Sequence, residues 1–176
     1  MNLKLKRTPG IYLVGFMCSG KSTVGRHIAH RLGWNFFDID TEIEAAEKVA
    51  ISEIFDTLGE AEFRRIEAAI LQQHVRWIER GRPAVLALGG GAFVEPANRD
   101  LLADRGISVW LDCPFETVRR RAAENENRPL ARDPQKFAAL YDSRRQVYAL
   151  ADVRIAIESD DPDTVVDAIL GRPELK

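Results

Sequence analysis

The chain has 176 residues, of which 45% are hydrophobic and 30% are charged, and its formal net charge is −2. Such a length and composition are typical of one soluble globular domain, here 1–176, whose core folds without disulfides. The balanced charge argues against nucleic acid as a partner, and no run reaches the roughly 18 apolar residues of a membrane-spanning helix. The two cysteines, Cys18 and Cys113, form no metal-binding pattern, and no signal peptide is visible, so we expect a cytoplasmic protein.

Short apolar segments alternate with segments of helical periodicity along the chain. In order, the sequence predicts a strand at 11–14, a helix that ends at Gly33, a strand at 34–40, a helix at 42–47, a long helix at 59–79, a strand at 84–88, a helix at 96–104, a strand at 107–111, helices at 114–124 and 135–150, a strand at 153–157 and a helix at 162–170. Ser52 is a candidate N-cap for a short helical stretch before the long helix. Five strands separated by helices predict an α/β fold, in which a parallel sheet has helices on both faces. Such sheets bind ligands beyond the carboxyl ends of their strands.

The segment Gly15-Phe16-Met17-Cys18-Ser19-Gly20-Lys21-Ser22 joins the first predicted strand to the first helix, and it fits the P-loop pattern G-x-x-x-x-G-K-[ST]. Its backbone N–H groups and the positive end of the following helix can hold phosphate oxygens. Lys21 can reach the β- and γ-phosphates of a nucleotide, and the Ser22 hydroxyl can ligate Mg²⁺. The alternative is a glycine turn that fits the pattern by chance, which the flanking strand and helix argue against. Cys18 is unusual here but is small enough for the loop.

Two carboxylates, Asp38 and Asp40, end the second predicted strand. Two residues apart in an extended chain, their side chains are expected to point the same way. Beside a nucleotide, one can hold a metal-bound water and the other can hydrogen-bond an acceptor hydroxyl and take its proton. The alternative is a solvated turn or a helix N-cap, which Asp40 before Thr41 would suit.

Three glycines, Gly89-Gly90-Gly91, follow the third predicted strand. They form either a flexible turn or a place where another group approaches the backbone closely, because no Cβ obstructs it. Their position at the ligand-binding edge of the sheet favours close approach.

On the long helix, Arg64 and Glu67 are neighbours at positions i and i+3. They form either a surface ion pair or an arginine aimed at an anionic substrate, with Glu67 fixing its rotamer. The sequence alone leaves both interpretations open.

A polar, proline-marked loop at 126–134 separates two later helices. Its Arg128 suits a lid that closes over a nucleotide, stabilises charge on the moving phosphoryl group and excludes water, while an ordinary exposed loop is the alternative. One of the arginines at 119–121 can lie on the face of an adenine. Arg144 and Arg145, on the next helix, face either the ligand crevice or solvent.

Together these residues resemble the shikimate kinase family over nearly the whole chain, from 11 to 170. The specific part is the P-loop combined with Asp38-x-Asp40, Gly59-Glu60-x-x-Phe63-Arg64-x-x-Glu67, Gly89-Gly90-Gly91 and Arg128-Pro129-Leu130. The resemblance implies the three-layer P-loop kinase fold, with a five-stranded parallel sheet in the order 2-3-1-4-5 and a lid. It also implies transfer of the γ-phosphate of ATP to the 3-hydroxyl of shikimate, with Mg²⁺, in aromatic amino-acid biosynthesis. We expect a monomer.

The same resemblance implies a role for each site residue. The residues that hold ATP would be Cys18, Ser19, Gly20, Lys21, Ser22, Thr23, Arg121 and Arg128. The residues that hold shikimate would be Asp40, Arg64, Glu67, Gly89, Gly90, Gly91 and Arg144, with Arg145 as the alternative to Arg144. Mg²⁺ would be bound by Ser22 directly and by Asp38 through water. The catalytic residues would be Lys21, Asp40 as base and Arg128 over the phosphates.

Two other functions remain open at this point. The chain could be another P-loop kinase of small molecules, such as a gluconate or nucleotide kinase, although paired arginines favour an acceptor with a carboxylate. It could also be a ligand-sensing module without catalysis. A pure binding protein, however, has little need for Lys21, Ser22, Asp38, Asp40 and Arg128 together.

Overall fold

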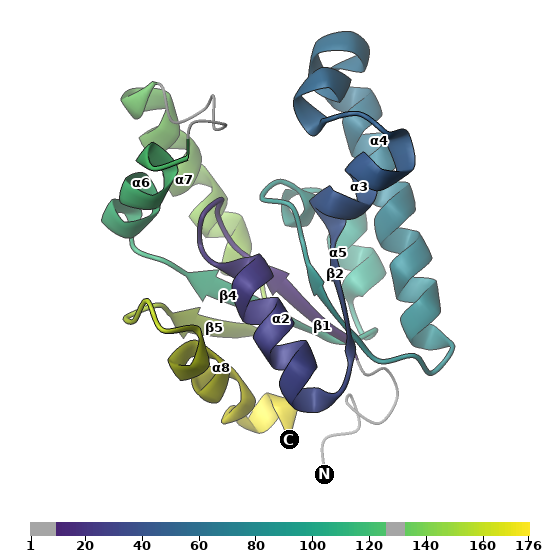
Figure 1. Ribbon diagram of the computed structural model, residues 1–176, viewed down its shortest axis with the longest axis vertical. Helices are drawn as coiled ribbons and strands as arrows, with labels where there is room; N and C mark the ends of the chain where they lie inside the picture. Colours follow the sequence, from purple (N-terminus) through teal and green to yellow (C-terminus); the bar gives the residue numbers. More distant parts are fainter. Residues whose placement is uncertain (1–9, 126–132) are drawn as a thin grey trace.

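Five parallel strands form the centre of the computed structural model, which describes residues 10–125 and 133–176 (Figure 1). The strands are β1 (Gly10–Val14), β2 (Asn35–Asp38), β3 (Ala84–Ala87), β4 (Ile107–Asp112) and β5 (Val153–Ala156). Their order in the sheet is β2-β3-β1-β4-β5, and every pair of neighbours is parallel. This order confirms the predicted fold.

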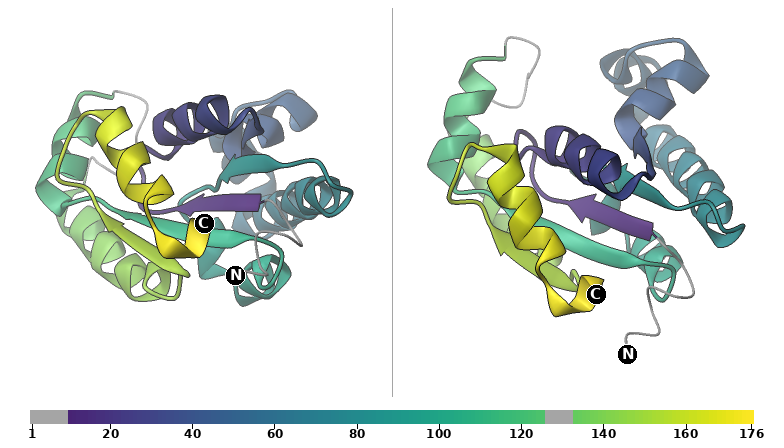
Figure 2. Two further views of the ribbon diagram at one scale, coloured as in Figure 1. Left: turned by 90° about the horizontal axis from the view of Figure 1, so that it is seen from below. Right: turned by 60° about the horizontal axis from the view of Figure 1, so that its bottom comes forward.

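Helices connect the strands and cover both faces of the sheet. They are α2 (Lys21–Leu32), α3 (Ile39–Glu47), α4 (Ile51–Glu79), α5 (Pro96–Leu102), α6 (Phe115–Ala123), α7 (Pro134–Tyr148) and α8 (Pro162–Leu170), with two short 3-10 helices, η1 (Ala92–Val94) and η3 (Pro173–Leu175). Helices α2 and α8 lie side by side on one face, and α5, α7 and the end of α4 cover the other (Figure 2). Of the helices in the described ranges, none is long and apolar enough to cross a membrane.

The central strand β1 anchors the P-loop to the core. Its residues Ile11, Tyr12, Leu13 and Val14 are each at most 1% exposed, because β3 and β4 flank the strand and helices cover it on both sides. Burying each large side chain of this kind contributes about 1.5–3 kcal/mol. The loop that follows Val14 therefore starts from a fully buried strand.

Several element ends differ from the sequence prediction by one or two residues, and two differences change the local structure. Helix α3 begins at Ile39, directly after β2, whereas the strand was expected to continue to 40. Helix α4 begins at Ile51 and continues through a kink at Gly59, where φ is 83°. Ser52 is therefore inside the helix and was wrongly predicted as its cap. The helix start is stabilised instead by Glu44, whose Oε1 accepts a hydrogen bond of 3.0 Å from the Ile51 N–H.

Structural elements from both ends of the sheet rise beyond the carboxyl ends of the strands. Helix α3 and the first half of α4 project on one side, and α6 with the first turns of α7 project on the other (Figure 1). The P-loop and the turn after β3 lie between them. This arrangement puts every predicted site residue within the described ranges at the same edge of the sheet.

Candidate active site

The P-loop leaves β1 after Val14 and enters α2 at Lys21. The N-cap of α2 is Gly20, which has a φ of 94° and no side chain to satisfy the first N–H groups of the helix. The N–H groups at the start of a helix can bind an anion, and the helix dipole favours negative charge there. Ser19, inside the loop, is 2% exposed, so the loop conformation is held by its own packing.

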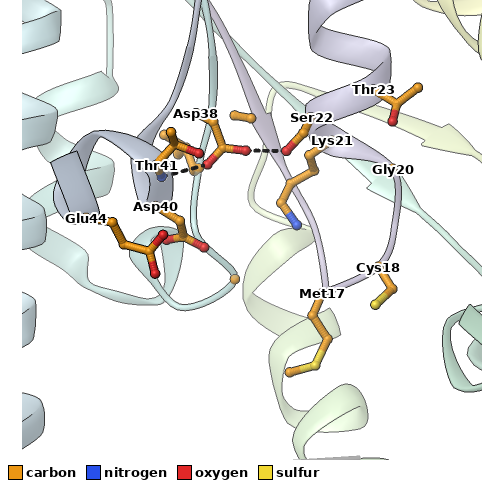
Figure 3. Close-up of a pocket in the computed structure, with 13 residues that line it drawn as sticks. Met17, Cys18, Gly20, Lys21, Ser22, Thr23, Asp38, Asp40, Thr41 and Glu44 are labelled. Atoms are coloured by element: carbon orange, nitrogen blue, oxygen red, sulfur yellow. Dashed lines mark hydrogen bonds between the residues drawn. The ribbon is translucent and has the colours of Figure 1, made fainter. Parts of the chain in front are cut away.

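Lys21 holds its ammonium group inside the P-loop. Its Nζ donates hydrogen bonds of 2.8 Å to the carbonyl oxygens of Gly15 and Phe16. Figure 3 shows Lys21 and Ser22 on one side of a pocket of about 310 Å³, with Asp38 and Asp40 on the other. Glu44 also lines it, so the pocket combines one cation and three carboxylates in a space next to the N-terminal end of a helix.

Asp38 and Asp40 both line this pocket, but by a different geometry from the one expected. They were predicted to point the same way from an extended strand. Asp38 is in fact the last residue of β2 and the N-cap of α3, where its Oδ1 accepts a hydrogen bond from the Thr41 N–H at 3.3 Å. Asp40 lies in the first turn of α3. The tight transition from strand to helix, rather than strand alternation, turns both carboxylates into the pocket.

Ser22 and Asp38 are in direct contact, because the Ser22 hydroxyl donates a hydrogen bond to Asp38 Oδ2. Hydroxyl and carboxylate oxygens are hard ligands of the kind that Mg²⁺ prefers, and Mg²⁺ commonly takes only one or two of them from the protein. The two oxygens lie beside Lys21 in the same pocket. This donor set fits a magnesium ion that is otherwise bound by phosphate oxygens and water.

The three glycines after β3 are each approached by a different side chain. A Cβ at Gly89 would lie 2.6 Å from Asp40 Oδ1, and one at Gly91 would lie 2.2 Å from Arg64 Nη2. At Gly90 it would lie 3.0 Å from Arg144 Nη1. The interpretation as a site of close approach is therefore correct, and the structure brings two arginines and a carboxylate together around one turn.

Arg64 reaches this turn from α4 and is held there by Glu67. Arg64 Nη1 donates a hydrogen bond of 2.7 Å to Glu67 Oε1, and the two side chains are 19% and 1% exposed. Burial raises the pKa of Glu67, and the charge of Arg64 opposes that shift. The pair is thus a buried, oriented contact and not a solvated surface ion pair.

The second oxygen of Glu67 lies close to Gly89 and Asp40. Glu67 Oε2 is buried and has no hydrogen-bond partner among the described residues. A Cβ at Gly89 would be 3.0 Å from this oxygen. A buried acceptor without a partner costs free energy, so a ligand hydroxyl or a water molecule that reached Oε2 would be stabilised there.

Helix α7 sends its two neighbouring arginines in different directions. Arg145 Nη1 lies 3.0 Å from Asp112 Oδ1, and the same nitrogen donates a hydrogen bond of 3.0 Å to the Tyr141 hydroxyl. Arg144 instead lies against Gly90, with its Cζ 5.9 Å from the ring centre of Phe16 in the P-loop. Arg144 is therefore the arginine that reaches the glycine turn, while Arg145 pairs with Asp112 at the end of β4. The sequence analysis missed Asp112, although a carboxylate at the end of an apolar strand is the same signal that identified Asp38.

The remaining predicted ATP-binding residues are Cys18, Thr23, Arg121 and Arg128. Arg121 Nη1 donates a hydrogen bond of 3.0 Å to the Cys18 carbonyl oxygen, and its Nη2 donates one of 2.6 Å to Asp160. Cys18 itself has a φ of 61°, a conformation that is uncommon for residues with a side chain. Thr23 is exposed in the first turn of α2. Arg128 lies outside the described residues.

The sheet order and the P-loop together define the class of this protein, that of the P-loop kinases of small molecules. A family model for shikimate kinase matches residues 17–172. The chain is 40% identical over 163 residues to a shikimate kinase of Persephonella marina, an alignment that covers 92% of this chain and 97% of the relative. The protein belongs to the shikimate kinase family.

Solved structures agree with this assignment. A shikimate kinase from Acinetobacter baumannii in complex with shikimate superposes with a TM-score of 0.84 at 37% identity, over 97% of this chain and 95% of that one. A shikimate kinase from Aquifex aeolicus gives a TM-score of 0.78 at 35% identity, over 92% and 93% of the two chains.

Proposed function

We propose that this protein transfers the γ-phosphoryl group of ATP to the 3-hydroxyl of shikimate, which yields ADP and shikimate 3-phosphate. Its family membership supports this reaction. The observation that carries the proposal is the convergence of Arg64, Arg144 and Asp40 on one glycine turn beside the P-loop. Two arginines suit the carboxylate of an acceptor, and a carboxylate suits its hydroxyl groups.

In the donor half of the site, the P-loop residues Cys18 to Thr23 surround the phosphates of ATP and turn backbone N–H groups toward them. Lys21 then exchanges its contacts with loop carbonyl oxygens for contacts with the β- and γ-phosphates, where it stabilises charge on the transferred group. Positioning and electrostatic stabilisation supply most of the catalysis in phosphoryl transfer. Once Lys21 has made this exchange on ATP binding, it stays on the phosphates through the transfer step.

Ser22 Oγ and Asp38 are the proposed protein contacts of Mg²⁺, Asp38 through a water molecule. The ion would neutralise charge on the β- and γ-phosphates. The hydrogen bond between Ser22 and Asp38 supports this role, because it keeps both oxygens at one position next to the phosphate-binding helix end. Chelation with EDTA should abolish ADP release, and added Mg²⁺ should restore it.

In the acceptor half, Asp40 is the proposed base and shikimate hydroxyl ligand. It lies between the two halves, because it lines the pocket with Lys21 and also contacts Gly89. A weak base is sufficient, since the acceptor hydroxyl loses its proton late in a loose transition state. Arg64, oriented by Glu67, and Arg144 bind the shikimate carboxylate on either side of the turn.

Two arginines complete the proposed nucleotide site. Arg121 is proposed to contact the adenine, supported by its contact with the P-loop at the Cys18 carbonyl oxygen. Arg128 is proposed to act from a lid at about 126–134 over the phosphates, and this rests on the sequence motif alone. We also propose that the chain is a single kinase domain, monomeric and cytoplasmic. Light scattering of the purified protein tests the oligomeric state.

A coupled assay of ADP release tests the proposed function. Purified protein is supplied with Mg–ATP and, in parallel, with shikimate, gluconate, a nucleoside monophosphate or no acceptor. ADP should appear at a high rate only with shikimate, and the product should be shikimate 3-phosphate by mass spectrometry. The variant Asp40→Asn is the matched control, because it keeps the size of the side chain and removes the base. Absence of shikimate-dependent turnover in the wild type would refute the proposal.

The same assay decides between the two alternatives. Turnover with another acceptor would indicate a different small-molecule kinase. Shikimate binding by calorimetry without ADP release in any mixture would indicate a sensing module. The buried pair of Arg64 and Glu67 argues against a neutral sugar as the acceptor, since such a sugar offers an oriented guanidinium no carboxylate to bind, and the acceptor panel separates shikimate from the anionic acceptors gluconate and nucleoside monophosphate.

A further inference from the structure

The hydroxyl of Tyr148, the last residue of α7, lies at the glycine turn of the acceptor pocket, beside Arg144. The side chain is 1% exposed, and its ring packs against Trp110 with the ring centres 6.3 Å apart. Its Oη donates a hydrogen bond to the carbonyl oxygen of Gly90. Arg144, one helical turn earlier, lies beside the same glycine. One phenol thus contacts the glycine turn at the point where the substrate arginine reaches it.

The chemistry of the groups fixes the direction of these contacts. Burial raises the pKa of Tyr148 to about 12, although the charge and hydrogen bond of Arg144 oppose the shift. The phenol therefore keeps its proton near neutral pH and donates it to Gly90. A guanidinium can only donate, so Arg144 is the donor in its interaction with the phenol oxygen. The contacts therefore run from Arg144, beside Gly90, through Tyr148 to the Gly90 carbonyl oxygen.

We infer that Tyr148 is a positioning residue for the acceptor, which orients Arg144 and the Gly90 carbonyl together. This inference rests on the proposed function. Without the hydroxyl, Arg144 loses the phenol oxygen as a partner beside Gly90, while its contact with the Phe16 ring remains. The Gly90 carbonyl loses its donor, and with it the orientation of the peptide unit that it shares with the Gly91 N–H. Both losses act on the same side of the site, that of shikimate.

Helix α7 carries a second tyrosine that is a close chemical match for the first. Tyr141 is 6% exposed, its hydroxyl donates a hydrogen bond of 2.7 Å to the Cys113 carbonyl oxygen, and it accepts one of 3.0 Å from Arg145. It too joins an arginine of α7 to the carbonyl of a turn after a strand. That turn follows β4, however, and not the glycine turn after β3. Tyr141→Phe therefore removes the same kind of hydroxyl without touching the acceptor pocket.

The test compares Tyr148→Phe with Tyr141→Phe in steady-state kinetics, with shikimate and ATP varied separately. Tyr148→Phe should raise KM for shikimate by about tenfold, because a hydrogen bond that orients a charged group is lost. KM for ATP should stay within twofold of the wild type. Tyr141→Phe should leave both constants within twofold, even where its melting temperature falls as much as that of Tyr148→Phe.

A double-mutant cycle then tests whether Tyr148 acts by positioning Arg144 or by stabilising the site in general. In an Arg144→Ala background, Tyr148→Phe should raise KM for shikimate much less than in the wild type, because Tyr148 acts through that arginine. Provided that the wild type is an active shikimate kinase, each of three results would overturn the inference. They are an unchanged KM for shikimate in Tyr148→Phe, equal effects of the two tyrosine variants, and full additivity of Tyr148→Phe with Arg144→Ala. A wild type without shikimate-dependent turnover would overturn the proposed function and this inference together.

Discussion

One added methyl group at Gly91 should displace Arg64 without disturbing the fold. Gly91 has a φ of −100° and a ψ of −11°, which alanine adopts readily. The new Cβ would lie 2.2 Å from Arg64 Nη2 and 2.7 Å from its Cζ. Since ordinary contacts of this kind need about 3.5 Å, the guanidinium must retreat by roughly 1 Å. It is the end of a flexible side chain, so the backbone has no need to move.

This displacement should weaken shikimate binding strongly. A misplacement of about 1 Å in a positioned group costs on the order of 100-fold, and loss of a hydrogen bond to a charged group costs about 1.5–3 kcal/mol. Gly91→Ala should therefore raise KM for shikimate between about 10-fold and 100-fold. KM for ATP should change less than twofold, and the midpoint of urea unfolding should stay the same or rise, since alanine restricts the unfolded chain. The coupled ADP assay and urea denaturation measure these quantities.

The double variant Gly91→Ala with Arg64→Ala is the control. Once the arginine is gone, the methyl group has nothing to displace, so it should add no further loss to that of Arg64→Ala. If Gly91→Ala left KM for shikimate unchanged, or if its effect persisted in full without Arg64, the steric reasoning would be wrong.

Three further changes test other parts of the molecule. Lys21→Ala should lower kcat by about 100-fold to 1,000-fold with the fold intact by circular dichroism, and near-normal turnover would reject its role on the transferred phosphoryl group. Cys18 lines the pocket, whereas Cys113 is buried and its pKa is raised by that burial, so iodoacetamide should alkylate Cys18 well before Cys113. Mg–ATP should slow the labelling of Cys18. Mass spectrometry of the peptides measures the order, and earlier labelling of Cys113 would contradict this prediction. Burial, with the charge of Glu79, raises the pKa of Tyr12. Above pH 10 the unfolded chain therefore loses a proton from this phenol that the folded state keeps. Because deprotonation stabilises the unfolded chain, the free energy of unfolding falls as the pH rises. In Tyr12→Phe the free energy of unfolding should fall less steeply with pH, by up to about 1.4 kcal/mol per pH unit, as measured by urea denaturation. The same pH dependence in wild type and variant would contradict a raised pKa for Tyr12.

Most of the fold could be predicted from sequence because burial on both faces of a parallel sheet leaves a clear pattern. The residues of β1 and β3 are apolar without interruption, and helix α8 has the bounds that were predicted for it. The end of β2 could not be predicted in the same way. Ile39 is buried and fits either a strand or the first turn of a helix. The cap that Asp38 forms with the Thr41 N–H decides between them, and a capping hydrogen bond has no periodicity that could reveal it.

The glycine turn shows where prediction of the site reaches its limit. Three glycines at the end of a strand indicate that something approaches the backbone, since this is the property that a missing Cβ provides. They do not indicate what approaches. Gly89 makes room for a carboxylate from α3, Gly90 for an arginine from α7 and Gly91 for an arginine from α4. The consecutive helices α3 and α4 meet the distant helix α7 at one turn, and only the packing of these helices on the sheet determines which side chain faces which glycine.

The choice between Arg144 and Arg145 follows from helix geometry once one contact is known. Neighbouring residues on a helix point about 100° apart, so the two arginines cannot both face the glycine turn. Asp112, at the end of β4, is 6% exposed and needs a cation because a buried carboxylate without one is costly. Arg154 supplies one at 2.6 Å, and Arg145 supplies a second at 3.0 Å. With Arg145 turned to Asp112, Arg144 and Tyr148, four residues apart on one face of α7, both reach Gly90. Of the two neighbouring arginines, the one that does not pair with Asp112 is therefore the one that enters the acceptor pocket.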